Sequence, residues 1–393
     1  MSIDRVNVVE GAIKPKLIHL SYDSPWNPWV AGGGAVRDWE LGRRLQADWD
    51  VELWSGAFPG CDAYGADSPR VRWLGLHRNN RWVSRISYAL AANRALRQQN
   101  PSKVVFSASP SIFAPVPALL DWPARTLLVI HHVVGLQNAW HKGGPLAFYA
   151  AWHERQLLSR GRHYVTVNNT VAAKVHALNP NAIVDVRPSA IEEDISTVVS
   201  NPDSDPTILF FGRLDVWMKG LDRLLDAFAL VQKKIPQARL LLSGKASEAT
   251  EAGLRARIAT LPDPSRAQIL PNVTNAEKLA LLGRSWVFAS PSRFEGWCLA
   301  AVEAQCCGLP VVATDADGFK DSVRDGRSGI LVPNRDADVV ANVARALTQL
   351  LSDSELRARM GADGRSWATG FTWEVVAKKH DEIYRRIVAE SLT

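Results

Sequence analysis

The sequence predicts an α/β protein with two doubly wound domains, each built on a mostly parallel sheet. Its 393 residues exceed the length that one hydrophobic core usually covers, so two domains of ordinary size are expected. In both halves, short apolar runs alternate with stretches of helical periodicity, which is typical of parallel strands joined by helices. A polar segment, residues 189–206, interrupts this alternation with acids, serines and prolines. We place the linker between the domains there.

The apolar runs fall into two sets, one on each side of this linker. The first set predicts strands at residues 16–21, 51–54, 103–107, 126–131 and 164–167. The second set predicts strands at residues 207–211, 238–244, 267–270, 286–290, 309–314 and 329–332. We therefore expect an N-terminal domain over residues 1–195 and a C-terminal domain over residues 205–371. The last helix, residues 372–393, carries an apolar stripe that needs a surface to cover, and we expect it to pack back on the N-terminal domain.

Composition excludes some functions and permits others. The net charge of +6 favours acidic partners such as nucleotides, nucleic acids or an anionic membrane. The basic residues are dispersed and match no known nucleic-acid-binding motif, so a nucleic acid partner is not expected. The 15 tryptophans permit a carbohydrate partner, because flat amphipathic rings suit the faces of sugars.

The sequence gives no sign of export, of a membrane span or of a metal site. No apolar stretch reaches the roughly 18 residues that a span needs, and the segment MSIDRVNVVEGAIKPK lacks the features of a signal peptide. We therefore expect a soluble, cytoplasmic protein. The four cysteines, Cys61, Cys298, Cys306 and Cys307, have no paired ligand spacing, so neither a disulfide nor a zinc site is expected.

A segment of the C-terminal half, SRFEGWCLAAVEAQCCGLPVV (residues 292–312), carries two glutamates eight positions apart. Residues 299–307 predict a short helix, because Gly308 can end it and an apolar run follows. Glu295 then lies on the loop at the helix N-terminus, where free N–H groups and the helix dipole favour an anion. The chain could hold a diphosphate there through the backbone of Gly296, Trp297 and Cys298.

Glu303 lies eight residues, about two turns, further along than Glu295, among small apolar residues. An ionised carboxylate in that setting costs several kcal/mol unless hydrogen bonds compensate it. Two ribose hydroxyls would satisfy it, as they do in dinucleotide-binding folds. A buried arginine or a backbone N–H group would also do so, and the spacing alone leaves both interpretations open.

Two cations follow the first predicted strand of the second half, in FFGRLDVWMKGLDRLLDAFA (residues 210–229). Arg213 lies just past the strand and Lys219 opens the next helix, so both can reach the carboxyl edge of the sheet, where such folds bind ligands. Arginine offers a planar fork and lysine a point charge, which suits a diphosphate leaving group whose charge grows during transfer. The alternative is that Arg213 and Lys219 are solvent-exposed loop residues that bind no ligand.

These segments resemble family 4 of the glycosyltransferases, retaining enzymes of the two-domain GT-B fold. Residues 291–318 resemble its E-x7-E segment, residues 210–229 its Gly-Arg and Lys-Gly positions, and residues 371–387 its C-terminal helix. The likeness is strong over residues 207–388 and fainter in the N-terminal half. The resemblance implies two Rossmann-like domains facing across a cleft, with Glu303 on the ribose. It also implies catalytic roles for Glu295, Arg213 and Lys219.

The N-terminal half supplies a glycine-rich loop and a histidine. Gly33 and Gly34 belong to a run of three glycines before a predicted helix, where backbone can approach a ligand closely. This run resembles the family's first glycine-rich loop, so we take both residues as donor contacts. His131 directly ends a predicted strand, where the family often has a histidine that contacts the donor sugar or its phosphate, and we prefer it to His132. A flexible turn and a structural histidine are the alternatives.

Two features depart from the family pattern. Asn168 and Asn169 stand where the family usually has a serine, and residues 187–194 replace its Pro-Asn-Gly turn, which puts donor contacts from those loops in doubt. Asp315 and Asp317 form an Asp-x-Asp pair, which holds a divalent metal in the other glycosyltransferase fold. Because that pair belongs to single-domain enzymes and no further ligand cluster accompanies it here, we expect no metal.

The sequence therefore predicts a retaining glycosyltransferase that moves a hexose or related sugar from a nucleoside diphosphate sugar. The acceptor is a hydroxyl of a glycan, a lipid-linked saccharide or a small molecule. No cofactor is expected, because Arg213, Lys219 and helix N–H groups supply the positive potential. Since no acid is obviously poised as a nucleophile, same-face attack assisted by the leaving phosphate is favoured. Another GT-B activity, such as a phosphorylase or a sugar-nucleotide epimerase, and a non-catalytic nucleotide-sugar- or glycan-binding protein are the alternatives.

Residues 77–99 interleave five arginines with apolar and aromatic residues. As a helix, this segment sets an apolar stripe beside cations, as expected of an element that rests on an anionic bilayer surface. A helix of an α/β domain also buries such a stripe against its sheet. The segment therefore leaves open a lipid-linked acceptor and a peripheral location at the inner face of the membrane. The arginines are Arg78, Arg81, Arg85, Arg94 and Arg97.

Overall fold

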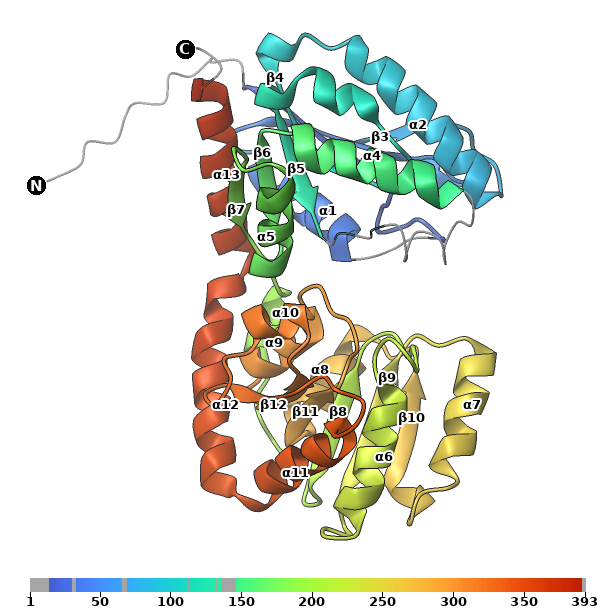
Figure 1. Cartoon of the computed structure of the whole chain (residues 1–393), viewed down its shortest axis with the longest axis vertical. Coiled ribbons are helices and arrows are strands. Elements are labelled where there is room, and N and C mark those ends of the chain that lie inside the picture. The colour runs from blue at the N-terminus through green and yellow to red at the C-terminus, as the bar shows by residue number, and fades with distance from the viewer. Residues whose placement is uncertain are drawn as a thin grey trace, which may run out of the picture. The chain divides into compact units, whose positions relative to one another are not determined.

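The computed structural model divides the chain into two compact units (Figure 1). It describes residues 14–390 except 30–32, 66–68, 112, 132, 134 and 136–145. The first unit comprises Met1–Thr166, Val171–Asp185 and Ala377–Thr393, and the second comprises Val167–Thr170 and Val186–Val376. The last helix, α13 (Trp373–Glu390), therefore begins in the second unit and ends in the first.

The first unit contains a seven-stranded sheet of order β3-β2-β1-β4-β5-β6-β7. The strands are β1 (Lys16–Ser21), β2 (Asp50–Gly56), β3 (Arg70–Leu74), β4 (Val104–Ser109), β5 (Thr126–Ile130), β6 (His163–Thr166) and β7 (Ile183–Val186). Strand β1 pairs in parallel with β2 and β4, with Leu17 opposite Val51 and Val105. The central strands β4 and β5 are buried along almost their whole length, as near-continuous apolar runs in a parallel sheet predict.

Helices pack on this sheet and complete its core. They are α1 (Gly33–Leu45), α2 (Arg81–Arg97), α4 (Leu146–Arg160), α5 (Asn169–Leu178) and the end of α13. Asn80 starts α2, because its side chain accepts hydrogen bonds from the backbone N–H groups of the second and third helical residues. One face of α2 is buried, where Tyr88, Ala92 and Leu96 join Phe106 in a single apolar cluster.

The second unit contains a six-stranded sheet of order β10-β9-β8-β11-β12-β13, in which every neighbouring pair is parallel. The strands are β8 (Thr207–Phe211), β9 (Arg239–Gly244), β10 (Ala267–Pro271), β11 (Val287–Ser290), β12 (Val311–Thr314) and β13 (Gly329–Val332). This is the strand order of a Rossmann-type sheet. The direction of winding reverses between β8 and β11, so ligands are expected at the carboxyl ends of these two strands.

Helices on the second sheet enclose a core of leucine, valine and phenylalanine. They are α6 (Leu221–Gln232), α7 (Glu248–Ile258), α8 (Asn275–Arg284), α9 (Leu299–Cys306), α10 (Asp317–Ser322), α11 (Val339–Ser352), α12 (Ser354–Ala368) and the start of α13. Helices α6 and α11 pack against each other, and so do α9 and α12. Leu224 and Phe228 of α6 lie fully buried in one cluster with Leu347 of α11.

The two doubly wound sheets confirm the predicted fold class, and the predicted strands all occur with small shifts at their ends. Strands β3 and β7 are absent from the prediction. Both form the outer edges of the first sheet, and no residue of β7 is fully buried. Edge strands face solvent on one side, and charged residues interrupt their short apolar runs here, namely Arg70 and Arg72 in β3 and Asp185 in β7.

Gly220 fixes the path of the chain just before α6. Its φ angle is 65°, a left-handed conformation that side chains disfavour. A Cβ atom at this position would lie 2.0 Å from the carbonyl oxygen of Pro291, which follows β11. Only glycine therefore allows the loop after β8 to approach the loop after β11 this closely.

We expect Gly220→Ala to lower the free energy of unfolding by at least about 2 kcal/mol, from the left-handed conformation and the backbone overlap together. Gly253→Ala is the matched control, because this residue lies inside α7 with nothing near its missing Cβ. Alanine there should stabilise the helix by up to about 1 kcal/mol. Urea unfolding followed by circular dichroism measures both effects, and equal stabilities of the two variants would contradict the constraint.

Candidate functional site

The predicted catalytic residues of the second unit lie at the switch point of its sheet. Arg213 and Lys219 belong to the segment between β8 and α6, and Glu295 belongs to the segment between β11 and α9. Strands β8 and β11 are paired neighbours, with Ile208 opposite Val287. The fold therefore brings two segments about 80 residues apart to the edge where Rossmann-type sheets bind ligands.

Lys219 and Glu295 form an ion pair, with 2.6 Å between Nζ and Oε2. The two side chains are only 19% and 12% exposed. Burial lowers the pKa of Lys219, but the Glu295 carboxylate and the nearby Cys298 outweigh it, so the net pKa is raised. Lys219 therefore stays positively charged beside the helix N-terminus.

Hydrogen bonds hold the loop around Glu295 from two sides. Its Oε1 accepts the N–H of Gly296 at 3.3 Å, and its carbonyl oxygen accepts the N–H of Gly318 at 3.0 Å. The side-chain nitrogen of Asn168 donates to the carbonyl oxygen of Gly296 at 2.5 Å. Asn168, which the sequence left in doubt as a donor contact, here positions the loop on which Glu295 lies.

The start of α9 leaves backbone donors available. Cys298 caps this helix in a left-handed conformation, with φ at 53° and no side-chain hydrogen bond to the helix. Within the described residues, the N–H groups of Trp297 and Cys298 have no hydrogen-bond acceptor. The Trp297 side chain is buried against Phe371, with 5.2 Å between the ring centroids, so only its backbone is open to a ligand. An anion would satisfy these donors.

Arg213 adds a second, more mobile cation to this site. Its side chain is 63% exposed and lies 3.8 Å from the carboxylate of Asp215. Its charge acts on Lys219, whose pKa it lowers slightly against the larger effect of Glu295. A guanidinium that is exposed but close to a fixed ammonium can turn toward an incoming diphosphate.

Glu303 is buried on α9 and paired with Lys278 of α8, with 3.1 Å between Nζ and Oε1. The sequence anticipated a buried arginine or a backbone group as the alternative partner, and the structure supplies a lysine instead. Burial raises the pKa of Glu303, and the Lys278 ammonium opposes this shift without cancelling it. Among the described residues, its Oε2 has no hydrogen-bond partner, so one oxygen remains for a ligand hydroxyl.

In the first unit, the structure brings Gly34 and His131 together. Helix α1 begins at Gly33, and a Cβ atom on Gly34 would lie 2.9 Å from Nε2 of His131. Glycine at this position therefore lets the helix start lie directly against the imidazole that ends β5. Both residues lie at the carboxyl edge of the first sheet, as predicted, while His132 lies outside the described residues.

Sequence reasoning missed a buried polar cluster at the switch point of the first sheet. Asp38 of α1 and Asp23, just after β1, line a small cavity of about 10 Å³, space for about one water molecule. Burial raises the pKa of Asp38 to about 7 against the opposing charge of Arg37, and that of Asp23 to about 6 against Arg85. Asp23 and Asp38 belong to no recognisable sequence motif. Only the order of the strands in the sheet shows that they lie at its switch point.

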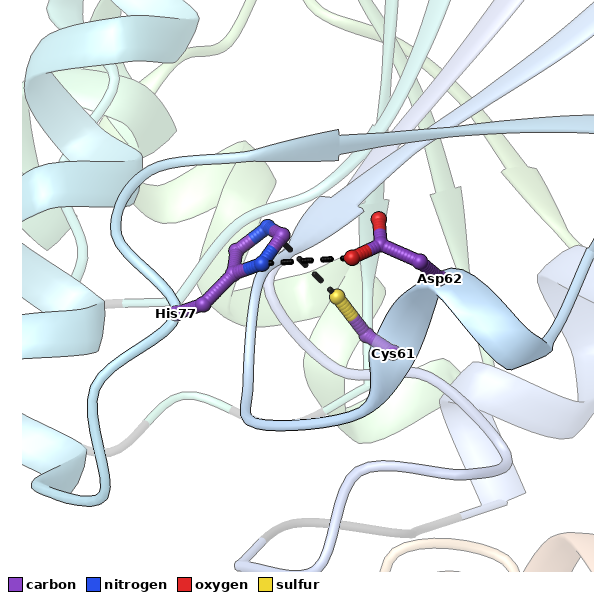
Figure 2. Close-up of side chains that lie close together, drawn as sticks. All are labelled: Cys61, Asp62 and His77. Carbon is purple, nitrogen blue, oxygen red and sulfur yellow. Dashed lines mark hydrogen bonds and ion pairs between the residues drawn. The ribbon is translucent and has the colours of Figure 1, made fainter.

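Within the described residues, one group of side chains could hold a metal ion, namely Cys61, Asp62 and His77 of the first unit (Figure 2). The imidazole presents Nδ1 to Oδ2 of Asp62 at 3.3 Å and Nε2 to Sγ of Cys61 at 3.8 Å. An ion takes a single imidazole nitrogen, so these two contacts do not converge on one point. The predicted Asp315–Asp317 pair is not part of such a group in the described chain, and Asp315 accepts the N–H of Asn334 at 2.8 Å.

Two family models match the chain, one over each half. The model for glycosyl transferases group 1 matches residues 192–367. The model for a glycosyl transferase 4-like domain matches residues 32–189. Both models describe glycosyltransferases and together they match most of the chain, which supports the predicted assignment to the family 4 glycosyltransferases of GT-B fold.

The relatives point to the same family. The chain is 35% identical over 187 residues to a phosphatidyl-myo-inositol mannosyltransferase of Mycobacterium leprae. The aligned region covers 47% of this chain and 48% of that protein. The chain thus spans about half the length of the curated relatives it matches.

Two solved structures share the fold over nearly the whole chain. Sucrose-phosphate synthase from Thermosynechococcus elongatus has a TM-score of 0.74 at 20% identity, over 95% of this chain and 100% of that one. Anabaena HepE in complex with UDP and glucose has a TM-score of 0.70 at 16% identity, over 95% and 100%. At such identities the likeness shows the fold alone.

Glu303→Ala should weaken the binding of nucleoside diphosphates by about 1 to 3 kcal/mol, or about 5- to 150-fold in Kd. The reason is the loss of a charged hydrogen-bond acceptor for the ribose. Because burial raises the pKa of Glu303, the wild type should bind more tightly as the pH rises through that pKa and the carboxylate ionises. Glu303→Gln should lose this dependence. Isothermal titration with UDP, GDP and ADP measures both, and unchanged affinities in both variants would disprove the ribose contact.

Proposed function

We propose that the protein transfers a sugar from a nucleoside diphosphate sugar to a hydroxyl group of an acceptor, with retention of configuration. The Lys219–Glu295 pair carries this proposal, because it fixes a cation and a carboxylate at the N-terminus of α9 in a Rossmann-type unit. A diphosphate needs cations and free N–H groups, and this edge of the sheet offers both.

The leaving group determines what these residues do. As the bond to the donor sugar breaks, negative charge grows on the nucleoside diphosphate. Lys219, Arg213 and the free N–H groups before α9 would stabilise that charge. Glu303 would meanwhile hold the ribose through its free carboxylate oxygen, so that binding energy far from the reacting bond orients the donor.

The hydrogen bonds of Glu295 support same-face attack. Its Oε2 is held by Lys219 and its Oε1 by the N–H of Gly296. A carboxylate with both oxygens engaged is a poor covalent nucleophile, because attack would require breaking an ion pair that is mostly shielded from water. We therefore infer that the leaving phosphate takes the proton of the acceptor hydroxyl, while Glu295 keeps Lys219 in place. In the first unit, His131 and the backbone of Gly33 and Gly34 remain proposed donor contacts.

Relatives guide the choice of substrates to test. HepE was solved with UDP and glucose, and the Mycobacterium leprae relative is a mannosyltransferase that acts on phosphatidyl-myo-inositol. We therefore infer a hexose donor and a hydroxyl-rich ring as acceptor, either soluble or linked to a lipid.

Transfer should survive chelation, because the cations and N–H groups of the chain are proposed to do the work of a metal. UDP-, GDP- and ADP-hexoses are incubated with soluble glycosides or short-chain phosphatidylinositol, with and without EDTA, and the anomeric product is identified by NMR. We expect transfer with retention at an unchanged rate in EDTA. Inverted product would refute the mechanism, and activity restored only by Mn²⁺ or Mg²⁺ would refute the metal-free proposal. Binding without turnover of any donor would favour a non-catalytic nucleotide-sugar-binding protein.

The first unit exposes an apolar surface beside several arginines. Both α2 and α4 pack against the short helix formed by Pro117–Asp121. Large apolar side chains are exposed there, including Ile86 and Leu90 on α2 and Phe148 and Trp152 on α4. No helix of the described residues is long and apolar enough to cross a membrane. We propose that this surface rests on an anionic bilayer and brings the protein to a lipid-linked acceptor.

The structure separates the arginines that could contact lipid from the one that does not. Arg78, Arg81, Arg94 and Arg97 are exposed, and Arg97 lies 3.6 Å from the carboxylate of Asp121. The Arg85 guanidinium lies over the rings of Tyr22, Trp82 and Phe113, and burial lowers its pKa. Arg85 therefore belongs to the packing of α2, and replacing it would test stability rather than lipid binding.

Replacing Arg78, Arg81 and Arg94 together with glutamate should reduce binding to phosphatidylserine vesicles by on the order of 100-fold. Each surface arginine contributes roughly 1 kcal/mol at low salt. The same three changes at exposed arginines of the second unit give an equal change in charge, and we expect them to retain most of the binding. Suitable positions are Arg327, Arg345 and Arg359. Co-sedimentation is the measurement, and equal losses in the two variants would show a general charge effect without a specific surface.

A further inference from the structure

Two aromatic side chains that are close in sequence to Lys219 and Glu295 project into solvent. Trp217 and Phe294 are each 58% exposed, and their ring centroids lie 5.7 Å apart. In the described part of the second unit, no other aromatic side chain is this exposed. Contact between apolar rings and water is unfavourable. Two adjacent exposed rings therefore indicate a surface that another molecule covers.

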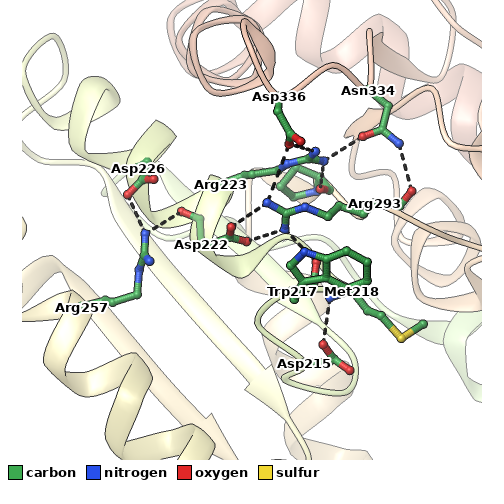
Figure 3. A network of polar contacts seen from close by, with 11 residues as sticks. Asp215, Trp217, Met218, Asp222, Arg223, Asp226, Arg257, Arg293, Asn334 and Asp336 are labelled. Carbon is green, nitrogen blue, oxygen red and sulfur yellow. Dashed lines mark hydrogen bonds and ion pairs between the residues drawn. The ribbon is translucent and has the colours of Figure 1, made fainter. Parts of the chain in front are cut away.

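Arg293 holds the Trp217 side of this aromatic pair in place (Figure 3). Its guanidinium donates to the carbonyl oxygen of Trp217 at 2.8 Å and lies 5.6 Å from the centre of the Trp217 ring. The same guanidinium forms two hydrogen bonds to the carboxylate of Asp222, at 2.9 and 2.8 Å.

Backbone contacts fix the loop further. The N–H of Arg293 donates to the carbonyl oxygen of Met218 at 2.9 Å, and the N–H of Met218 donates to the carboxylate of Asp215 at 2.8 Å. The loop that carries the rings is therefore ordered before a ligand binds, which lowers the conformational entropy that the protein loses on binding.

The position of the pair along the site identifies its ligand. Glu303 lies on α9, and Glu295 lies four residues before the start of that helix at Leu299. With the ribose at Glu303 and the diphosphate at the start of α9, the transferred sugar lies at the Glu295 end. Phe294 precedes Glu295 directly, and Trp217 lies two residues before Lys219. The pair therefore lies at the end of the donor opposite the nucleoside, where the acceptor must approach.

We propose that Trp217 and Phe294 form a subsite for the acceptor, in which the apolar face of a pyranose or inositol ring stacks on the two aromatic rings. An aromatic face covers the C–H groups of such a ring and leaves its hydroxyls free, so the reacting hydroxyl can point toward the donor. The assignment rests on the proposed glycosyl transfer. It adds the residues that recognise the acceptor to those that hold the donor.

Kinetics on the full chain test the subsite. The variants are Trp217→Ala, Phe294→Ala, their combination and Trp217→Phe, with Leu230→Ala as a control for loss of an exposed apolar side chain elsewhere in the same unit. The probes are short-chain phosphatidylinositol and methyl α-mannopyranoside as acceptors, and the donor that the wild type turns over. We expect the double variant to raise the acceptor KM by about tenfold or more. Its Kd for the nucleoside diphosphate without acceptor should stay within about twofold of the wild type. Trp217→Phe should restore most of the acceptor affinity.

Three outcomes would overturn the assignment in distinguishable ways. An unchanged acceptor KM in the double variant removes the subsite but leaves the proposed transfer intact. An equal rise in the Kd of the nucleoside diphosphate assigns the rings to the donor instead. A wild type that turns over no donor refutes the proposed function, and the subsite with it. Thermal unfolding of each variant is measured alongside, and if the double variant does not fold, the single variants give the same comparison.

Discussion

The ion pair between Lys219 and Glu295 is the interaction on which the second unit's site depends. It joins the segment after β8 to the segment after β11, and removing either partner would leave a charge that is mostly shielded from water. The backbone around the pair is built to allow it. Gly220 lets the two segments touch, and Gly318 lets α10 approach within a distance at which any Cβ would overlap Gly296. Trp217 and Phe294 are close in sequence to the two partners, and the free N–H groups of Trp297 and Cys298 follow Glu295 directly before α9.

A second constraint is the cost of burying charge. The Glu303 side chain is only 12% exposed, and the Lys278 ammonium opposes the effect of burial without cancelling it, because the pKa of Glu303 stays raised. Such a residue is poorly satisfied in the free protein. A ligand hydroxyl that donates to its remaining oxygen would stabilise the ionised form, so ligand binding and proton release are coupled. The same logic in the first unit raises the pKa of Asp38, whose cavity is too small for more than water.

The sequence was sufficient to predict the fold class, since the central strands of both sheets are long apolar runs between helices. It missed β3 and β7 because they are edge strands with little apolar signal. At the site, it predicted Arg213 just past a strand, Lys219 at the start of the next helix and Glu295 on the loop before a helix, and the parallel topology brings these segments to one edge of the sheet. It could not find Lys278 or Asn168, since a contact between α8 and α9, or between Asn168 and the Gly296 loop, leaves no trace in the spacing of either segment.

The residues that the sequence did not reveal share a physical property. Residues that touch a ligand are constrained by its chemistry, so they occur as recognisable patterns such as two glutamates at fixed spacing. Residues that hold those residues in place are constrained only by local geometry. A lysine, an asparagine or a backbone carbonyl can each perform such a task. Arg293 belongs to this second group, because it supports the loop of Trp217 through a carbonyl oxygen. Its role follows from the folded contacts, and so does the inference that the exposed rings it supports are ready to bind.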